Sequence, residues 1–320
     1  MVNSLLEIRE TVELHGLKFE NYLIEVVPDF KVIVKNIKES MEIQIDYSEK
    51  KRLKLFKTLE KILGTKISLT KLYPHEILSY IENDGSFGKT LWSPIGKAMH
   101  DFNMIEAGDR VAVGFSGGKD SMTVINALVR IKKISGLNFE IIPIHIHPAE
   151  DISRTDKIQQ YCHNMGLELQ IIETSLGEML FGEEKIKNPC FLCGRIRRGI
   201  LYTAMKNQNI NKLVLGHHKD DIIETFLMNS FYQGNQHMMK PSYQAEEYGV
   251  QVIRPLAYVE ENDIIRYVKK LNLPILKSIC PYETSTDSKR LRIKNLIKDL
   301  AEENKDVRST IFHSIKDKLV

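Results

Sequence analysis

The sequence predicts an α/β protein with a doubly wound parallel sheet, preceded by a small α+β domain. From about residue 91 onward, short apolar runs typical of strands alternate with helical patterns, the order that builds a parallel sheet covered on both faces. Before that point, segments rich in Val, Ile, Tyr and Phe come first and helical patterns follow. We therefore assign residues 1–90 to a small module of unknown role and residues 91–320 to the main domain.

The amino-terminal module is predicted to open with strands and to close with helices. Residues 20–27 and 30–47 alternate in part and contain the runs KVIVKN and MEIQID, which are typical of strands. Residues 48–64 begin with a capping serine, space their apolar residues at helical intervals and end at a glycine, which predicts a helix. A short helix is expected at about 74–83, and the turn-rich sequence NDGSFG is interpreted as the linker.

The main domain is predicted as repeated strand–helix units. The expected strands are residues 110–115, 140–146, 167–172, 212–215 and 251–253. The expected helices lie between and after them, at residues 121–132, 155–165, 195–207, 220–230, 260–271 and 288–302. In such sheets ligands bind beyond the carboxyl ends of the strands, so functional residues are expected in the loops that follow the strands.

Composition places the chain in a broad class and excludes others. It has 320 residues, of which 42% are hydrophobic and 27% charged, as in ordinary globular proteins. The net charge of +3 neither requires nor excludes a nucleic-acid partner, because local patches matter more than the total. Four cysteines are too few for a secreted disulfide scaffold. No apolar stretch is long enough for a transmembrane helix and the start lacks a signal-peptide core, so we expect a cytoplasmic protein without membrane contact.

The first strand of the main domain runs directly into the sequence SGGKDS and then into a helix. Two glycines allow a tight turn and a close approach of the backbone to a ligand. The start of the helix presents free N–H groups and a partial positive charge, which suits phosphate. The spacing is not that of a Walker A loop, since Asp120 stands where that loop has its magnesium-binding Ser or Thr. The residues expected to bind phosphate are Ser116, Gly117, Gly118, Lys119, Asp120 and Ser121.

A second motif, LGHHKDDIIETFLMN, follows the strand at 212–215 and opens the next helix. Its Asp220 and Asp221 lie at the carboxyl edge of the sheet, where they could hold Mg²⁺ on the phosphates of a nucleotide. The same carboxylates would equally cap the helix without any catalytic role, and the sequence leaves both interpretations open. Gly216 and His217 are assigned to nucleotide binding. The candidate catalytic residues are Lys119, Asp120, Asp220 and Asp221.

Three of the 4 cysteines are placed for chemistry. Cys190 and Cys193 form a CxxC pair, which brings two sulfurs within reach of one metal or of each other, and Cys280 follows in the sequence SICPYETST. From spacing alone, the open interpretations are an iron–sulfur cluster with one iron not held by the protein, a dithiol that carries a persulfide or acts as a redox pair, and a zinc site or no chemical role. Cys162 sits in a helical pattern and is predicted to be a core thiol.

The sequence SGGKDS between a strand and a helix resembles the PP-loop of the ATP pyrophosphatases, which cleave ATP between the α and β phosphates. Four blocks in order, residues 95–121, 190–202, 215–229 and 252–264, are similar to the tRNA 2-thiocytidine synthetase (TtcA-type) family. The resemblance implies an HUP-like fold, ATP bound by the PP-loop with the Asp pair beside its phosphates, and a 4Fe-4S cluster on the three cysteines. The expected cofactors are ATP, Mg²⁺ and this 4Fe-4S cluster, with Cys190, Cys193 and Cys280 as its ligands.

The resemblance also implies a thiolation reaction in two steps. The enzyme would adenylate a pyrimidine carbonyl oxygen, taken as that at C2 of cytidine, and a sulfur nucleophile would then displace AMP to give 2-thiocytidine. The expected partners are tRNA as substrate and a sulfur donor such as a cysteine desulfurase or sulfide, with a homodimer as one expected assembly. The alternatives are tRNA 2-thiouridine synthesis, a PP-loop ligase or sulfurtransferase that acts on a small molecule, and a non-catalytic nucleotide-binding or iron–sulfur sensor.

Basic residues flank the cysteines and would supply the cationic path that tRNA needs. The predicted RNA-binding residues are Arg195, Arg197 and Arg198 after the CxxC pair, and Lys289, Arg290 and Arg292 after Cys280. The helix at 288–302 is predicted to turn these cations outward, because its apolar side would consist of Leu291, Ile293, Leu296, Ile297 and Leu300. The alternative for both clusters is a solvated helix face.

The sequence departs from the TtcA-type pattern in two places. Where that family usually has a second CxxC, this chain reads Cys280-Pro281-Tyr282-Glu283 and keeps only the first cysteine. This form is closer to the 2-thiouridine enzymes (TtuA-type), although those enzymes carry zinc-ribbon cysteines that the present sequence lacks. The amino-terminal module is the second departure.

Overall fold

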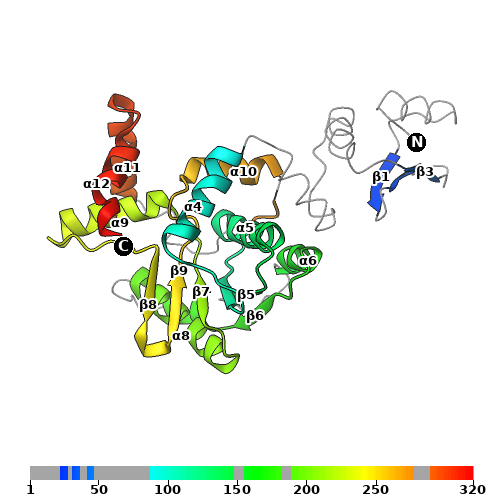
Figure 1. Cartoon of the computed structure of the whole chain (residues 1–320), viewed down its shortest axis with the longest axis horizontal. Helices are drawn as coiled ribbons and strands as arrows, with labels where there is room; N and C mark the ends of the chain where they lie inside the picture. The colour runs from blue at the N-terminus through cyan, green and yellow to red at the C-terminus, as the bar shows by residue number, and fades with distance from the viewer. Residues whose placement is uncertain are drawn as a thin grey trace. The chain divides into compact units, whose positions relative to one another are not determined.

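A six-stranded sheet forms the centre of the larger of two units in the computed structural model (Figure 1). The units are Met1–Gly85 and Ser86–Val320. The structure describes residues 22–27, 31–36 and 42–46 of the first unit, and residues 87–147, 155–181, 189–271, 273–276 and 289–319 of the second. None of the helices within these ranges is both long and apolar enough to cross a membrane.

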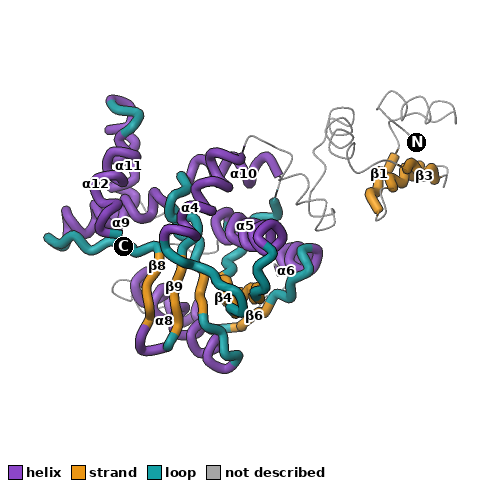
Figure 2. Tube along the Cα trace, viewed as in Figure 1, coloured by secondary structure: helices purple, strands orange, loops and turns teal. Residues whose placement is uncertain are grey.

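The large sheet has the strand order β6-β5-β4-β7-β9-β8 (Figure 2). Neighbouring strands pair in parallel except at one edge, where β8 runs antiparallel to β9. The predicted doubly wound α/β class is therefore confirmed. The edge strand is a difference from the prediction, since its sequence SYQA is short and lacks an apolar run. The strands are β4 (Arg110–Gly114), β5 (Glu140–His147), β6 (Gln170–Glu173), β7 (Lys212–Val214), β8 (Ser242–Ala245) and β9 (Val250–Ile253).

Helices cover both faces of this sheet, as Figure 1 shows for α5 and α8. On one face, α7 and α8 pack on β5 in a core that contains Ile144, Leu180 and Tyr202. On the other face, a buried chain of hydrogen bonds joins α5, α6 and α10, in which Asn126 of α5 lies between two tyrosine hydroxyls. The helices flanking the sheet are α5 (Lys119–Ser135), α6 (Asp156–Asn164), α7 (Leu176–Phe181), α8 (Pro189–Asn207) and α10 (Glu261–Leu271).

A separate helical layer forms around α9, beside the carboxyl terminus of the chain (Figure 1). Ile293 and Ile297 of α11 are buried there, as predicted. Leu296 and Leu300 are 40% and 37% exposed, so their assignment to the apolar side of this helix is wrong. The reason is that α9 and α12 cover only one narrow strip of α11. The remaining elements of this unit are η5 (Gly88–Trp92), α4 (Ser93–Asp101), α9 (Lys219–Tyr232), η7 (Glu246–Tyr248), α11 (Lys289–Glu303), α12 (Val307–Ile315) and η8 (Lys316–Lys318).

The first unit contains a three-stranded antiparallel sheet in the order β1-β2-β3. Its strands are β1 (Tyr22–Val27), β2 (Lys31–Asn36) and β3 (Glu42–Asp46). Strand character was expected over both predicted segments, and the second of them, residues 30–47, contains two strands. The helices expected at 48–64 and 74–83 lie outside the described residues.

A buried ion pair joins the amino ends of the central strands. Asp109, just before β4, lies 2.8 Å from Nζ of Lys212 at the start of β7, and the two side chains are 7% and 6% exposed. Asp109 also accepts from the N–H of Glu106 at 2.6 Å and from the amide of Asn211 at 2.8 Å. Burial would raise the pKa of Asp109, but these donors outweigh it and lower the pKa, so the carboxylate stays ionised.

Asp109→Leu is expected to destabilise the protein by about 3–5 kcal/mol, because it leaves the buried ammonium of Lys212 without its counter-charge. The free energy of unfolding in urea measures this. Glu140→Ala is the matched control, since it removes the exposed partner of Arg110 and is expected to cost only about 0–1 kcal/mol. An Asp109→Leu, Lys212→Met double variant should recover most of the stability that Asp109→Leu loses. Equal losses in Asp109→Leu and Glu140→Ala would contradict the role of burial.

Candidate active site

A cavity of about 380 Å³ opens at the carboxyl ends of β4, β5 and β7. Its walls come from the β4–α5 turn, the end of β5, the β7–α9 loop and one side of α8. This is the edge at which ligands bind in parallel sheets. The predicted site residues that line the cavity are Ser116, Asp120, Ser121, Arg197, Arg198, Gly216, His217 and Asp221.

The turn between β4 and α5 depends on a residue in the left-handed conformation. Gly117 has a φ of +75°, which residues with a Cβ rarely adopt. A Cβ at this position would also lie 2.7 Å from Cδ1 of Leu276, so only glycine fits both the backbone and its neighbour. The N–H of Leu276 donates to the Gly117 carbonyl at 2.9 Å and ties the segment after α10 to the turn.

Hydrogen bonds fix both ends of the turn. Nδ1 of His145 on β5 lies 2.7 Å from the carbonyl oxygen of Phe115, and because a carbonyl only accepts, this nitrogen carries the proton. Burial lowers the pKa of His145, so the ring is neutral near pH 7. At the other end, the Ser121 hydroxyl donates to the Gly118 carbonyl at 3.0 Å, and the Gly118 N–H donates to the Ser116 hydroxyl at 3.2 Å.

Lys119 begins α5 and is held between two carboxylates. Its Nζ lies 2.9 Å from Asp120 and 3.3 Å from Glu261 at the start of α10. Burial would lower the pKa of Lys119, but the carboxylates outweigh it and raise the pKa above its usual value. The ammonium therefore stays charged beside the turn. Burial raises the pKa of Asp120, and the opposing effects of Lys119 and His218 do not cancel this.

The first turn of α9 uses both acidic residues of the LGHHKDD motif. His218 is the N-cap: its Nδ1 accepts from the Asp221 N–H at 3.4 Å, and the Asp221 carboxylate accepts from the His218 N–H at 2.9 Å. Asp220 accepts from the Glu261 N–H at 2.8 Å and from Nε of Arg308 at 3.1 Å. The capping interpretation thus describes the local structure, and of the two carboxylates it is Asp221 that also lines the cavity.

Arg290 joins α11 to the same cavity. Its guanidinium pairs with Asp221 and with Glu224, the latter at 2.7 Å from Nε. Burial would raise the pKa of Asp221, but the nearby His218 and Arg290 lower it below its usual value, so the carboxylate is ionised. Arg290, predicted to bind RNA, is therefore engaged by α9, whereas Lys289 and Arg292 beside it are exposed.

A buried arginine that sequence reasoning missed orients one of the predicted site residues. Arg254 directly follows β9, is 7% exposed, and donates from Nε to Nδ1 of His217 at 3.1 Å. Because Nδ1 accepts, the proton of the neutral ring is on Nε2. Burial, and then the charge of Arg254, lower the pKa of His217 to about 4, so it presents a neutral ring to the cavity. The feature of the sequence that could have identified Arg254 is its position as a charged residue immediately after a predicted strand.

The CxxC pair lies in the first turn of α8, which begins at Pro189 and not at 195 as predicted. Proline is favoured at this position because the first helical N–H has no partner in the helix. Cys193 is a free thiol, half-buried against the core, and the next residue, Gly194, lines the cavity. Cys162 is fully buried and burial raises its pKa to about 12, as expected for a core thiol.

Of the remaining residues predicted to bind metal or RNA, some line the cavity, one is exposed, and two lie wholly or in part outside what the structure describes. Cys280 and the side chain of Cys190 lie outside what the structure describes, so the three-cysteine set stays a prediction. Arg195 is exposed, while its neighbours Arg197 and Arg198 line the cavity. Across the described ranges, no group of three or more His, Cys, Asp or Glu side chains is arranged to hold a metal ion.

Known proteins resemble this chain in sequence and fold. A family model for the PP-loop domain matches residues 93–298. The tRNA-cytidine(32) 2-sulfurtransferase of Syntrophotalea carbinolica is 37% identical over 69% of this chain and 85% of its own length. The protein of that name from Geotalea uraniireducens is 38% identical over 69% and 88%. A solved structure of the U34-tRNA thiolase NcsA from Methanococcus maripaludis, with its 4Fe-4S cluster, shares the fold with a TM-score of 0.58 and 23% identity, over 72% of this chain and 80% of that one.

The parallel sheet, the glycine turn at its carboxyl edge and the cavity above it define a nucleotide-binding protein of the PP-loop class. Within this class, the chain belongs to the tRNA 2-thiocytidine synthetase (TtcA-type) family of PP-loop ATP pyrophosphatases. The resemblance seen in the sequence is thereby confirmed. The protein is an enzyme of the ATP-dependent sulfurtransferase type.

The half-buried His217 is expected to make the protein less stable as the pH falls from about 6.5 to about 4. Its pKa is about 4 when folded, against ~6.5 in an unfolded chain, so the unfolded state binds more protons across this window and its formation is favoured. The free energy of unfolding in urea, measured across this window, gives the slope. His217→Asn keeps an acceptor for Arg254 but does not titrate, so a slope as steep as that of the wild type would contradict this role.

Proposed function

We propose that the protein converts cytidine 32 of tRNA to 2-thiocytidine in an ATP-dependent reaction. The observation that carries this proposal is that one cavity is lined both by the PP-loop and by the helix that begins with the CxxC pair. Adenylation takes place on the C2 oxygen and sulfur transfer on C2 itself, so the residues that serve the two steps must share a site. The names of the relatives support cytidine 32 as the base.

The cavity suits the phosphates of ATP. The Gly117 turn and the start of α5 supply backbone N–H groups and the positive end of the helix dipole. On the opposite wall, Nε of Arg197 is buried without a hydrogen-bond partner among the described residues, and a phosphate oxygen would satisfy it. Arg198 adds a second guanidinium to this wall. Arg197 and Arg198, predicted to bind RNA, are therefore better suited to the nucleotide.

Asp120 and Asp221 are the carboxylates that would hold Mg²⁺, since both line the cavity and come from facing elements. Mg²⁺ in nucleotide sites is held by one or two carboxylates together with the phosphates. When bound, the ion would neutralise charge on the leaving pyrophosphate. Asp220 is engaged by Arg308 and the Glu261 N–H, so its role is to hold the first turn of α9 in place.

In the first step, the C2 carbonyl oxygen attacks the α-phosphorus, an O–P bond forms, and the bond to the β-phosphate breaks to release pyrophosphate. The turn N–H groups and Lys119 stabilise the charge on the phosphates, and they need no reorganisation because the contacts of His145 and Leu276 already fix the turn. The neutral ring of His217 would donate a hydrogen bond to the phosphates without adding charge. In the second step a sulfur nucleophile attacks C2, the C–O bond breaks, and AMP leaves with the oxygen.

The residues that would hold a 4Fe-4S cluster are Cys190, Cys193 and Cys280, which is a set that leaves one iron free of protein ligands. On either side of Cys280 in the sequence, described residues contact the site: Leu276 donates to Gly117 and Arg290 pairs with Asp221. When bound, the free iron would hold the incoming sulfide. Sulfide or a cysteine desulfurase would supply the sulfur, and the reaction would take place in the cytoplasm.

Anaerobic incubation of the protein with tRNA, ATP, Mg²⁺ and sulfide should produce 2-thiocytidine, measured by mass spectrometry of the digested nucleosides. Lys119→Ala is expected to lower pyrophosphate release at least ~100-fold without removing iron, because it removes the positive charge held beside the phosphate turn. Lys132→Ala, at the exposed far end of α5, is the matched control. Formation of 2-thiouridine would show that uridine, and not cytidine, is the modified base. Pyrophosphate release without any thiolated nucleoside would favour a small-molecule acceptor.

Protein purified without oxygen should contain iron and sulfide and show the broad visible absorption of an Fe–S centre. Cys193→Ala is expected to lose this absorption and most of the iron, because the cluster would be left with two protein ligands. Cys162→Ala removes a core thiol and should keep the iron, with thermal unfolding as a check on its fold. Wild-type protein without iron would exclude the cluster, and full iron in Cys193→Ala would exclude Cys193 as one of its ligands.

A further inference from the structure

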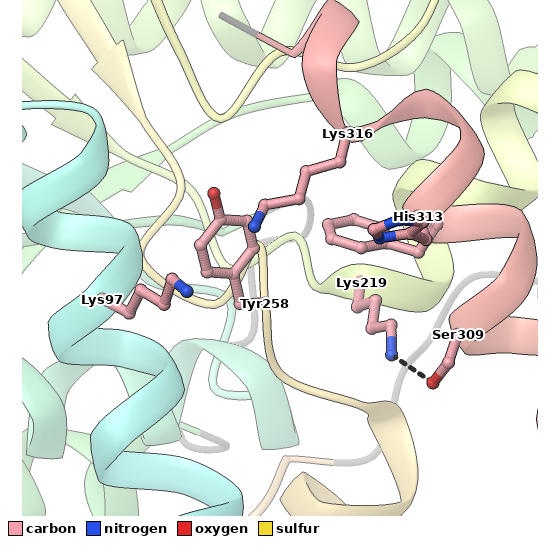
Figure 3. Close-up of a pocket in the computed structure, with 7 residues that line it drawn as sticks. Lys97, Lys219, Tyr258, Ser309, His313 and Lys316 are labelled. Atoms are coloured by element: carbon pink, nitrogen blue, oxygen red, sulfur yellow. Dashed lines mark hydrogen bonds between the residues drawn. The ribbon is translucent and has the colours of Figure 1, made fainter.

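A second pocket, of about 240 Å³, lies between α4, α9 and α12 (Figure 3). Lys219, the first residue of α9, lies in its wall, two positions before Asp221. Each pocket is thus lined by one residue from the first turn of α9. The proposed function makes no use of this second pocket.

The pocket contains ammonium groups but no carboxylate in its lining. Lys97 of α4 and Lys316 of η8 extend toward the ring of Tyr258 from different elements (Figure 3). Lys316 lies 5.6 Å from the centre of that ring, and among the described residues neither lysine forms an ion pair. Lys219 differs, since it pairs with Glu260 at 2.8 Å. Two positive charges that converge without a counter-charge favour the binding of an anion.

Aromatic rings form the apolar part of the wall. Tyr258 is half-buried and packs edge-on against Phe102 and Phe312, with ring centres 5.8 and 5.7 Å apart. Its hydroxyl donates to Asp101 at 3.0 Å, which fixes the ring and engages the nearest carboxylate of α4. A rigid aromatic wall beside cations that have no carboxylate partner among the described residues matches a planar base attached to a phosphate.

We infer that this pocket binds one unpaired nucleotide of the RNA substrate, with the base against Tyr258 and Phe312 and the phosphate between Lys97 and Lys316. The inference rests on the proposed function, which supplies RNA as the substrate. A volume of 240 Å³ is below the roughly 300–1,000 Å³ of pockets that enclose drug-sized ligands, so the pocket is too small for a nucleoside triphosphate. A free mononucleotide carries the same base and phosphate groups, and the test distinguishes it from a nucleotide within tRNA.

The test measures the affinity of the full-length protein for unmodified tRNA at several salt concentrations. The Lys97→Ala, Lys316→Ala double variant is expected to bind about tenfold more weakly, with the slope of log K against log salt reduced by about 1 to 2. The matched control is Lys318→Ala, which removes the same charge from the same short helix but contacts Gln236 outside the pocket. ATP-dependent pyrophosphate release with a saturating tRNA concentration should be unchanged.

Aromatic variants test the base contact. Tyr258→Phe keeps the ring and should bind tRNA as the wild type does, whereas Tyr258→Leu should bind several-fold more weakly at the same salt concentration. Because loss of the ring could also unfold the layer around α12, thermal unfolding is measured for both variants, and the lysine variant provides the independent test.

Unchanged tRNA affinity in the lysine variant would overturn the inference, as would an equal loss in Lys318→Ala. Weaker binding of free AMP with unchanged tRNA binding would identify a mononucleotide site in its place. Wild-type protein that binds tRNA but forms no thiolated nucleoside would refute the proposed function and leave this binding test valid. Wild-type protein that binds no tRNA would refute both.

Discussion

The structure depends on one constraint: the protein must hold the turn after β4 in a single shape at the edge of the sheet, where it can bind a ligand. Three contacts achieve this. His145 donates to the Phe115 carbonyl, Leu276 donates to the Gly117 carbonyl, and Gly216 lets the β7–α9 loop approach so closely that a Cβ there would lie 3.2 Å from the backbone of Asp120. Each contact comes from a different part of the sheet edge, so the phosphate site forms only when the whole edge is assembled.

At the same edge of the sheet, carboxylates lie beside basic side chains, and the partner of each residue determines its role. Asp220 is paired with Arg308 and serves the helix start, while Asp221 is shared between its capping bond, Arg290 and the cavity. Burial, and then the charge of Arg254, lower the pKa of His217 and keep its ring neutral, which gives the cavity a donor that does not repel cations. Side chains of one motif thus separate into structural and ligand-facing groups through their partners in space.

Much of the fold could be predicted from sequence because the dominant signals are local. Alternation of apolar strands and helices identified the doubly wound sheet, and SGGKDS placed the phosphate turn at the end of the first strand. The antiparallel β8 was missed because an edge strand needs no apolar run. Leu296 and Leu300 were placed inside because periodicity shows which side of a helix is apolar, but not how much of that side a neighbour covers.

The sequence by itself determined the class of chemistry, since a glycine turn before a helix, a CxxC pair and an acidic helix start are each readable within a few residues. Only the tertiary structure decided which of those residues face the ligand. It placed Arg197 and Arg198 on the cavity wall, engaged Arg290 with α9, and brought Arg254 to His217 across 37 positions of the chain. The physical reason is that charge pairing and burial depend on distances between elements that are remote in sequence, and no local pattern encodes those distances.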